Sequence, residues 1–476
     1  MLSIPRPNPE IFMNKATWTD EHPPATTAFS DRPNTESTNL LRSNRWLGRV
    51  ADFARQLGQS SSTVSVSKRP GYHIAPEHLV VIAQVSSRRV SATVAALHQM
   101  HGDKVVAHKS IDCDWHRLSQ GGKQEALAEA VRLACDSAGV EAYSVYMSMN
   151  DASFASRLAV GWADPGDEVV LTEHERLWAL KRARDQATGA DQELIDAIPV
   201  HWTVRDRGGE RDVVDPVGER GSRLTCQALL ITARRGYTEE LRSLVAGLGL
   251  ELEGIIAHPV ALFRGISSAI PRKASTVIID CGARCTTILV RRKERLVHVE
   301  TYAFGGEDLT RLLVEKLHIT VSQAEDLKRD LDISQRADER DNLMGQQFIW
   351  SDVRERHRLL GPAMSLMSEA VGSFFRARAQ ELRDHGHLVQ HGQVHLVGRA
   401  SSLGGIALFL KDIFGLTVVL GSGHKQRDPS AELADVLVSG LVCTAADLRR
   451  THLTQQQSQF RKTASGVWNW LTREME

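Results

Sequence analysis

Several features are scarce or missing in this 476-residue sequence, and each absence excludes a class of protein. No stretch of 18 or more residues is continuously apolar, so we expect no helix that spans a bilayer. The N-terminus lacks the apolar core of a secretory signal, so we expect none. Basic and acidic residues number 58 each, so no overall field draws the chain to nucleic acid.

Cysteine is also scarce, and its spacing shows no paired framework. Such usage is typical of a reducing compartment. The closest pair has the spacing C-x3-C, but no second ligand pair lies nearby, so we interpret both as small apolar turn residues and not as a zinc site. The six cysteines are Cys113, Cys135, Cys226, Cys281, Cys285 and Cys443.

The first 75 residues are rich in proline, serine, threonine and asparagine. Such a segment buries too little apolar area to offset chain entropy, so we predict a disordered arm. Residues 40–58 interrupt it with a basic, amphipathic pattern that predicts a short helix. Its apolar positions are Trp46, Val50, Phe53 and Leu57.

Two similar α/β units follow the arm. From residue 78 the pattern predicts a strand, a hairpin partner, a third strand, a helix and another strand. From residue 275 the same opening recurs, and VIAQVSSRRVSATV and IIDCGARCTTILV occupy corresponding places. Two such halves are expected to face each other across a cleft.

The second hairpin, STVIIDCGARCTTILVRRKERLV at 275–297, ends a buried strand in polar residues. Asp280 and Gly282 precede Thr286 and Thr287, which open the next strand. One interpretation is a phosphate loop in which the acid orients a metal ion. The other is an ordinary hairpin with glycine at its turn, and the residues alone leave both open.

The last residues, FRKTASGVWNWLTREME, predict an amphipathic helix that follows a polar linker. Its apolar face suits a membrane interface. Spacing alone equally allows a helix docked on its own domain. The residues of the apolar face are Val467, Trp468, Trp470, Leu471 and Met475.

The duplicated hairpin and the later turn VHLVGRASSLGGIALFL resemble the actin-like nucleotide-binding fold. Within that fold the chain resembles the FtsA family of bacterial cell-division proteins. The most specific match is IPVHWTVRDRGGERDVVDPVGERGSRLTCQALLITA at 198–233. Weaker matches are the segment at 147–180, the helix HITVSQAEDLKRD and the terminal SGVWNWLTREME.

The resemblance implies an α/β, actin-like (ribonuclease-H-like) two-lobed ATPase fold with an inserted small α/β subdomain. The expected parts are the arm at 1–75, a first lobe at 76–148 and 223–274, an FtsA-type insert at 149–222, a second lobe at 275–425 that includes a subdomain at about 307–370, a closing helix at 426–447, a linker at 448–459 and a membrane-targeting helix at 460–476.

The resemblance also implies ATP with Mg²⁺ in the cleft, with Asp280 as the metal-orienting acid. The nucleotide-binding residues that it implies are Asp280, Gly282, Thr286, Thr287, Gly305, Gly306, Glu325, Lys328 and Gly398. Three departures count against this ligand. Gln84 takes the acidic place of the first hairpin, Ser86 takes its glycine place, and Arg399 replaces a glycine of the adenine-side turn. Arg88 and Arg89 could instead pair with phosphate directly. We expect at most a weak ATPase and assign no catalytic residue.

The function implied by the resemblance is to tether FtsZ filaments to the cytoplasmic face of the inner membrane at the division site and to recruit later division proteins. The implied partners are the FtsZ C-terminal tail, a second copy of the chain and the lipid surface. Nucleic acid is not among them. Two alternatives remain: a scaffold of type IV pilus assembly resembling PilM, and a weak phosphotransferase of the same fold.

Overall fold

A computed structural model describes residues 65–66, 78–97, 103–187, 189–267, 269–271, 274–334, 353–388, 391–421 and 436–450. The predicted basic helix at 40–58, most of the linker at 448–459 and the whole terminal helix at 460–476 lie outside these residues. Inside the arm that composition predicted to be disordered, the short strand β1 (Ser65–Val66) pairs with β5 (Val140–Glu141).

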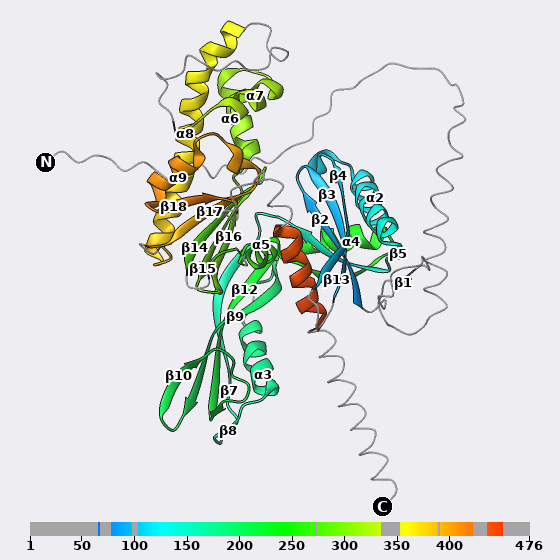
Figure 1. Cartoon of the computed structure of the whole chain (residues 1–476), viewed down its shortest axis with the longest axis vertical. Helices are drawn as coiled ribbons and strands as arrows, with labels where there is room; N and C mark the ends of the chain where they lie inside the picture. Colours follow the sequence, from blue (N-terminus) through cyan, green and yellow to red (C-terminus); the bar gives the residue numbers. More distant parts are fainter. Residues whose placement is uncertain are drawn as a thin grey trace, which may run out of the picture. The chain divides into compact units, whose positions relative to one another are not determined.

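The first lobe is built on a five-stranded sheet with the order β13-β6-β2-β3-β4 (Figure 1). The predicted hairpin is present, because β2 and β3 pair antiparallel from Leu79↔Ala96 to Ser86↔Arg89. On its other side β2 pairs in parallel with β6. The strands are β2 (Leu79–Ser86), β3 (Arg89–Ala96), β4 (Lys104–Asp112), β6 (Ser144–Met149) and β13 (Glu251–Ile255).

The second lobe repeats this order as β18-β17-β14-β15-β16 within a nine-stranded sheet. Its hairpin pairs antiparallel from Ser275↔Arg292 to Cys281↔Thr286, and β14 pairs in parallel with β17. The duplication predicted from the two similar sequence stretches is therefore confirmed. The strands are β14 (Ser275–Cys281), β15 (Thr286–Arg292), β16 (Arg295–Tyr302), β17 (Gln393–Val397) and β18 (Thr417–Leu420).

An insert follows β6 and has its own small core. Its helix α3 (Glu173–Arg184) packs on three of its strands (Figure 1). Gly161 makes the close approach possible. A Cβ atom at Gly161 would lie 2.0 Å from the carbonyl oxygen of Ala179. One bridge, Glu300↔Ala155, joins the insert to β16. The insert's strands are β7 (Ala155–Ala163), β8 (Val169–Val170), β9 (Gln192–Asp206), β10 (Gly209–Val213), β11 (Arg220–Gly221) and β12 (Arg223–Arg234).

The helix predicted after the third strand of the first lobe is present, and the closing helix, which was predicted at 426–447, is described at 436–450. In the first lobe, α2 begins after the N-cap Ser119 and ends at Gly139, which takes the left-handed conformation that glycine tolerates. It packs on β3 and β4. The helices are α2 (Gln120–Ala138), α4 (Arg235–Gly247), α5 (His258–Ser267), α6 (Gly306–Leu317), α7 (Val321–Asp330), α8 (Val353–Asp384), α9 (Ile406–Phe414) and the short 3-10 helices η3 (Trp115–Arg117) and η5 (Arg399–Ser402).

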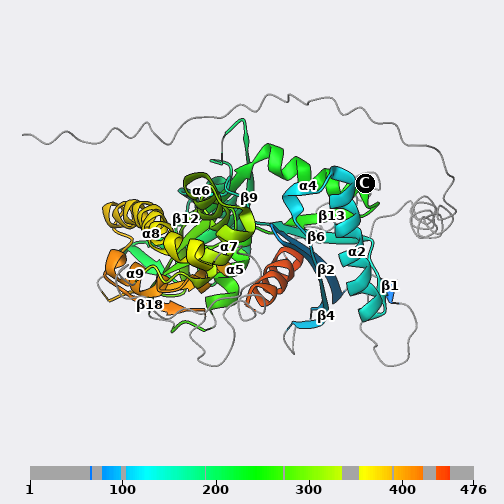
Figure 2. The ribbon, with the colours of Figure 1, turned by 90° about the horizontal axis from the view of Figure 1, so that it is seen from above.

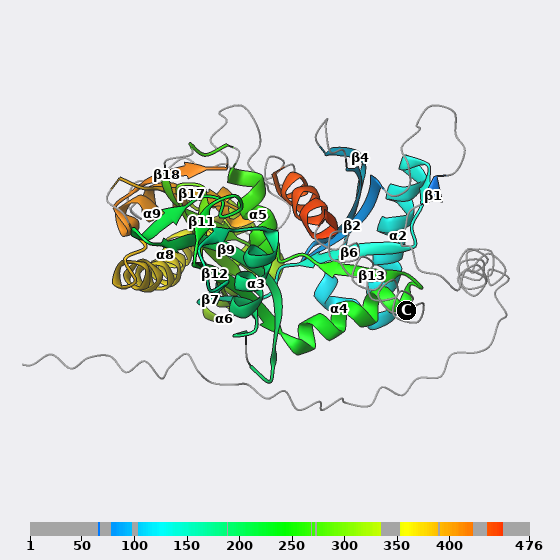
Figure 3. The ribbon, with the colours of Figure 1, turned by 90° about the horizontal axis from the view of Figure 1, so that it is seen from below.

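A further helix at 436–450 crosses α5 at very close range. A Cβ atom at Gly440 would lie 1.8 Å from the carbonyl oxygen of Ala261, and one at Gly265 would lie 1.9 Å from that of Val436. Glycine on both helices therefore brings the two backbones together. Figures 2 and 3 show this helix in red beside α5 and the first sheet.

Candidate functional site: the tips of the two hairpins

The two hairpins place their polar residues at equivalent positions. Gln84 pairs with Ser91 across the first hairpin, and Asp280 pairs with Thr287 across the second. Each strand thus carries an amide or acid opposite a hydroxyl, close to the turn. The structure therefore places Gln84 where the second lobe has its acid, as the family resemblance implied.

Asp280 is buried, and a histidine that the sequence analysis did not single out holds it in place. The side chain is 7% exposed, and its Oδ2 accepts a hydrogen bond from Nε2 of His258 at 2.9 Å. His258 begins α5 and is 7% exposed. On the other side, a Cβ atom at Gly398 would lie 2.5 Å from Asp280 Oδ1. The carboxylate is therefore enclosed by protein on two sides.

The hydroxyls of Thr286 and Thr287 are also engaged within the protein. Thr286 donates to the carbonyl oxygen of Phe304 at 2.7 Å, and the Thr287 hydroxyl lies 3.1 Å from that of Thr301. Both threonines are buried. In this arrangement they hold β15 against β16 and the turn after it.

The predicted glycines bring two turns of the second lobe into contact. The N–H of Gly306 donates to the carbonyl of Gly282 at 3.1 Å, and the N–H of Glu307 donates to Ala283 at 2.7 Å. A Cβ atom at Gly305 would lie 2.5 Å from the carbonyl oxygen of Ala283. Several of the amide groups at the start of α6 are therefore already used by the hairpin turn.

Glu325 and Lys328 lie together one helix farther on. Lys328 Nζ donates to Glu325 Oε1 at 2.7 Å, to Thr310 Oγ1 at 2.7 Å and to the carbonyl of Gly306 at 3.0 Å. Burial acts to raise the pKa of Glu325, but the hydrogen bonds from Lys328 and Thr310 outweigh it and hold that pKa below its ordinary value. The predicted residues 305, 306, 325 and 328 thus form one cluster.

Arginines from both lobes face the space between the hairpin tips. Nη1 of Arg88 lies 3.3 Å from Oδ2 of Asp114, and its Nη2 lies 3.8 Å from Oε1 of Glu307. Nε of Arg284, in the second hairpin, lies 3.8 Å from Oε2 of the same glutamate. Glu307 is therefore shared by two arginines that come from different hairpins.

Two further arginines are close enough to act on the same region. Arg89 forms a 2.7 Å ion pair with Asp112, and this hydrogen bond, helped by the charge of Arg399, holds the pKa of Asp112 below its ordinary value. Burial lowers the pKa of His116, and the charge of Arg284 lowers it further. Guanidinium groups of both lobes therefore act on titratable groups near the two hairpins.

The described residues contain no cluster of three or more histidine, cysteine, aspartate or glutamate side chains that could hold a metal ion. Cys281 and Cys285 are both buried, and burial raises the pKa of the Cys285 thiol to about 12. A thiol that stays protonated is a poor metal ligand. This agrees with the interpretation of the pair as apolar turn residues.

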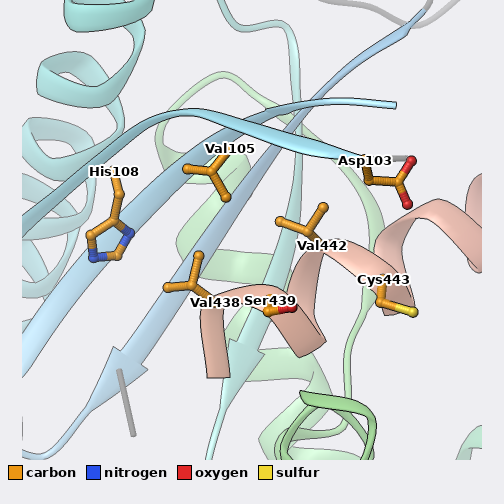
Figure 4. A pocket seen from close by; sticks show the side chains of 7 residues that line it. All are labelled: Asp103, Val105, His108, Val438, Ser439, Val442 and Cys443. Carbon is orange, nitrogen blue, oxygen red and sulfur yellow. The ribbon is translucent and has the colours of Figure 1, made fainter. Parts of the chain in front are cut away.

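A separate cavity of about 480 Å³ lies in the first lobe, between β4 and the helix at 436–450. Figure 4 shows Val105 and His108 of the strand facing Val438, Ser439 and Val442 of the helix. Asp103 and Cys443 complete the lining. None of the predicted nucleotide-binding residues takes part in it.

These contacts test the fit of a magnesium nucleotide. Its metal would need an accessible carboxylate, but Asp280 is bonded to His258 and covered by Gly398. Its phosphates would need free amides or hydroxyls, but those of Gly306, Glu307, Thr286 and Thr287 already have partners. The residues present therefore do not fit Mg²⁺–ATP, and the nine predicted contacts stay predictions.

Comparison with known families decides the identity. The model described as "Cell division protein FtsA" matches residues 277–437, and "SHS2 domain inserted in FTSA" matches residues 153–232, which together are just over half of the chain. The chain belongs to the FtsA family. The family predicted from the residue patterns is thus confirmed.

Curated FtsA proteins support the assignment along most of the sequence. The FtsA of Agrobacterium fabrum is 25% identical over 373 residues, which are 72% of this chain and 81% of the relative. That of Enterococcus hirae is 25% identical over 305 residues, which are 62% of this chain and 66% of the relative.

A solved structure titled "PilM-PilN type IV pilus biogenesis complex" matches with a TM-score of 0.52 at 16% identity, covering 78% of this chain and 99% of that one. At this identity the likeness shows the fold alone. The chain therefore has the predicted actin-like, two-lobed α/β fold, and the PilM alternative is matched only as a fold.

The sequence analysis of this FtsA-family chain missed three residues that contact or lie beside the predicted site residues: His258, Arg284 and Glu307. His258 stands alone in the apolar run IIAHPVALF, and Glu307 looks like an ordinary first-turn acid of α6. Each acts through partners more than 20 residues away, so no local pattern could have revealed them.

Proposed function

We propose that this FtsA-family protein is a peripheral adaptor that ties FtsZ filaments to the cytoplasmic face of the inner membrane at the division site and recruits later division proteins. The observation that carries the proposal is the insert. Its helix and strands replace a simple connection between β6 and α4, and the span 153–232 matches the FtsA-specific insert.

Exposed apolar side chains on the insert support self-association. Leu158 and Val160 on β7 are 48% and 44% exposed, and Trp178 on α3 is 44% exposed. Aromatic and aliphatic groups left in water commonly mark contact surfaces. In the proposal, the insert of one copy contacts a second copy in a polymer or dimer.

The FtsZ tail is assigned to the subdomain at about 307–370, which contains α6, α7 and the first part of α8. Val321 at the start of α7 is 52% exposed and offers an apolar contact there. Membrane attachment is assigned to residues 460–476, with the basic segment at 40–58 as a second signal. A single short amphipathic helix binds reversibly, so two signals or self-assembly are needed for stable attachment.

No described helix is long and apolar enough to cross a membrane. Catalytic turnover is not part of the proposal, because the cleft residues do not fit a magnesium nucleotide.

The test is co-sedimentation of the full chain with FtsZ and anionic vesicles. The wild type should pellet with vesicles and carry FtsZ with it. Trp468→Glu should bind vesicles about tenfold or more weakly, because it exchanges a buried indole for a charge that must be desolvated. Asn469→Glu adds the same charge at a position outside the predicted apolar face and should have a much smaller effect.

FtsZ binding is then measured in the absence of vesicles. The Trp468→Glu variant should still bind FtsZ, which separates filament binding from membrane attachment. Equal pelleting of Trp468→Glu and wild type would remove the membrane part of the proposal. A chain that binds vesicles but never FtsZ would remove the adaptor part and favour a pilus-type scaffold.

A further inference from the structure

The cavity between β4 and the helix at 436–450 has an apolar wall and a volume of about 480 Å³ (Figure 4). Val105 of the strand, which is 39% exposed, faces Val438 and Val442 of the helix across it. Pockets of about 300–1,000 Å³ hold small organic molecules. This cavity therefore has room for a large aromatic side chain.

The strand that borders the cavity lies at the edge of its sheet. Among the described strands, β4 pairs with β3 alone. Folded proteins commonly cover such an edge with a helix or a loop, because unpaired backbone groups otherwise invite contacts with other chains. The helix at 436–450 lies beside the edge but leaves the cavity open to solvent, since Ser439 and Cys443 of the lining are exposed. A further element is therefore expected to cover the cavity.

The last described turn of this helix lies at the rim of the cavity. Arg449 is buried and donates to the carbonyl oxygen of Leu79 at 2.9 Å, which fixes the turn to the start of β2. Nη2 of Arg450 lies 3.6 Å from Oδ1 of Asp103, which belongs to the cavity lining. The sequence that follows Arg450 therefore begins beside the cavity.

That sequence is long enough to return to the cavity. Residues 451–466 separate Arg450 from Val467, where the predicted apolar face of the terminal helix begins. A fully extended segment of this length reaches about 55 Å. A tether of this kind holds its end at an effective concentration on the order of 1 mM. Even a weak contact between the terminal helix and the cavity would therefore be well populated.

We propose that the apolar face of the terminal helix docks in this cavity when no membrane is present, with the Trp468 indole between Val105 and Val442. The indole buries a large apolar surface, and its N–H can donate to the hydroxyl of Ser439 at the rim. Docking and membrane insertion use the same face, so each excludes the other. This regulatory role rests on the membrane attachment proposed above, but the docked contact itself requires no lipid.

Cys443 is a natural probe of the contact. All six cysteines belong to the described residues, and Cys443 is exposed, whereas Cys113 is half-buried and the other four are buried. The rate of its reaction with N-ethylmaleimide is measured on the full chain without vesicles, with Cys443→Ser as the background. Trp468→Glu should react about tenfold faster than the wild type, as expected if about nine-tenths of the chains are docked. Asn469→Glu should react like the wild type.

A variant of the cavity wall tests the competition with lipid. Val105→Glu places a charge in the cavity and should free the terminal helix. Cys443 should then react faster, and anionic vesicles should be bound severalfold more tightly, up to about tenfold. The added negative charge by itself would weaken binding to such vesicles. Val217→Glu, at a valine of the insert that is 43% exposed, is the matched control and should change neither quantity.

Equal Cys443 rates in the wild type and Trp468→Glu would overturn the docking, whatever the vesicles show. Protection that grows with protein concentration would assign the cavity to the helix of a second copy and would overturn it as well. If Val105→Glu bound vesicles no more tightly than Val217→Glu, the competition with lipid would be refuted. The proposed membrane attachment fails by a different result, which is equal vesicle binding by the wild type and Trp468→Glu.

Discussion

The two hairpins have the same strand order, yet their tips have different chemistry. The first turns through Ser87 and Arg88 alone and places arginines in solvent, whereas the second turns through four residues and buries Asp280. Strand pairing depends on backbone groups that every residue except proline carries. A duplicated sheet can therefore keep its register while the side chains at its tips change role.

The two lobes differ most in how deeply they bury the residue at the acidic position, which is Asp280 in the second lobe and Gln84 in the first. We therefore expect substitution of Asp280 to have the largest effect on the free energy of unfolding. Asp280→Ala should lower the free energy of unfolding by about 3 kcal/mol, because His258 then stays buried with its donor unpaired. Gln84→Ala, at the equivalent place in the first hairpin, should cost less than about 1 kcal/mol, because Gln84 is only partly buried. Urea unfolding of both variants measures the difference.

The matched control is Asp280→Asn, which keeps an oxygen acceptor for His258 Nε2. It should recover more than half of the loss. If Asp280→Ala and Gln84→Ala lowered the free energy of unfolding by the same amount, the two hairpin tips would contribute equally to stability, and the comparison would be contradicted.

A smaller difference is expected at the hydroxyls opposite these two residues. Thr287→Val should cost about 1 kcal/mol, because it removes the partner of the buried Thr301 hydroxyl. Ser91→Ala should be close to neutral, since it exchanges a buried hydroxyl for an apolar group beside apolar strand neighbours. Thermal unfolding of the two variants, with Thr301→Val as the reciprocal control, checks the order.

The smallest expected effect concerns pH and the third strand of each lobe. The ring of His298, on β16, lies 4.8 Å from that of His387 between centroids at a tilt of 31°, and burial lowers the pKa of His387 to about 4. The unfolded chain binds this proton near the ordinary pKa of 6.5, so the unfolded state takes up protons first as the pH falls. The contribution of His387 to the free energy of unfolding should therefore be fully present above about pH 6.5 and decline toward pH 4.

The measurement is the thermal midpoint between pH 7 and pH 4 for the wild type and for His387→Gln. Between pH 7 and pH 4 the thermal midpoint of the variant should fall less than that of the wild type, with a difference of a few degrees at most. His108→Gln, on the equivalent strand β4, is the control, because His108 is exposed. An identical decline in wild type and His387→Gln would assign the acid sensitivity elsewhere.

Local patterns predicted the strands, the helices and the duplication because these depend on periodicity and turn residues within short windows. Both hairpins and the helix after Ser119 appear where the pattern placed them. The extent of β12 was harder to predict. It continues the insert's sheet to Arg234, past the boundary at residue 222 that was expected from the resemblance.

The cleft was less predictable, because its chemistry depends on distant pairings. The sequence identified Asp280, Gly305 and Lys328 as polar or glycine positions of interest, and the structure describes all of them. It could not show that His258 bonds to Asp280 or that Glu307 lies between Arg88 and Arg284. Only a folded chain brings such residues within reach of one another.

The glycine crossing between α5 and the helix at 436–450 has a mechanical consequence. Two backbones in direct contact at Gly265 and Gly440 leave no soft side-chain layer to absorb a displacement. A load applied to the chain at residue 450 therefore passes stiffly into α5. Because α5 begins with His258, the same load reaches Asp280 at the tip of the second hairpin. The helix at 436–450 is thus coupled stiffly to the acid at the tip of the second hairpin.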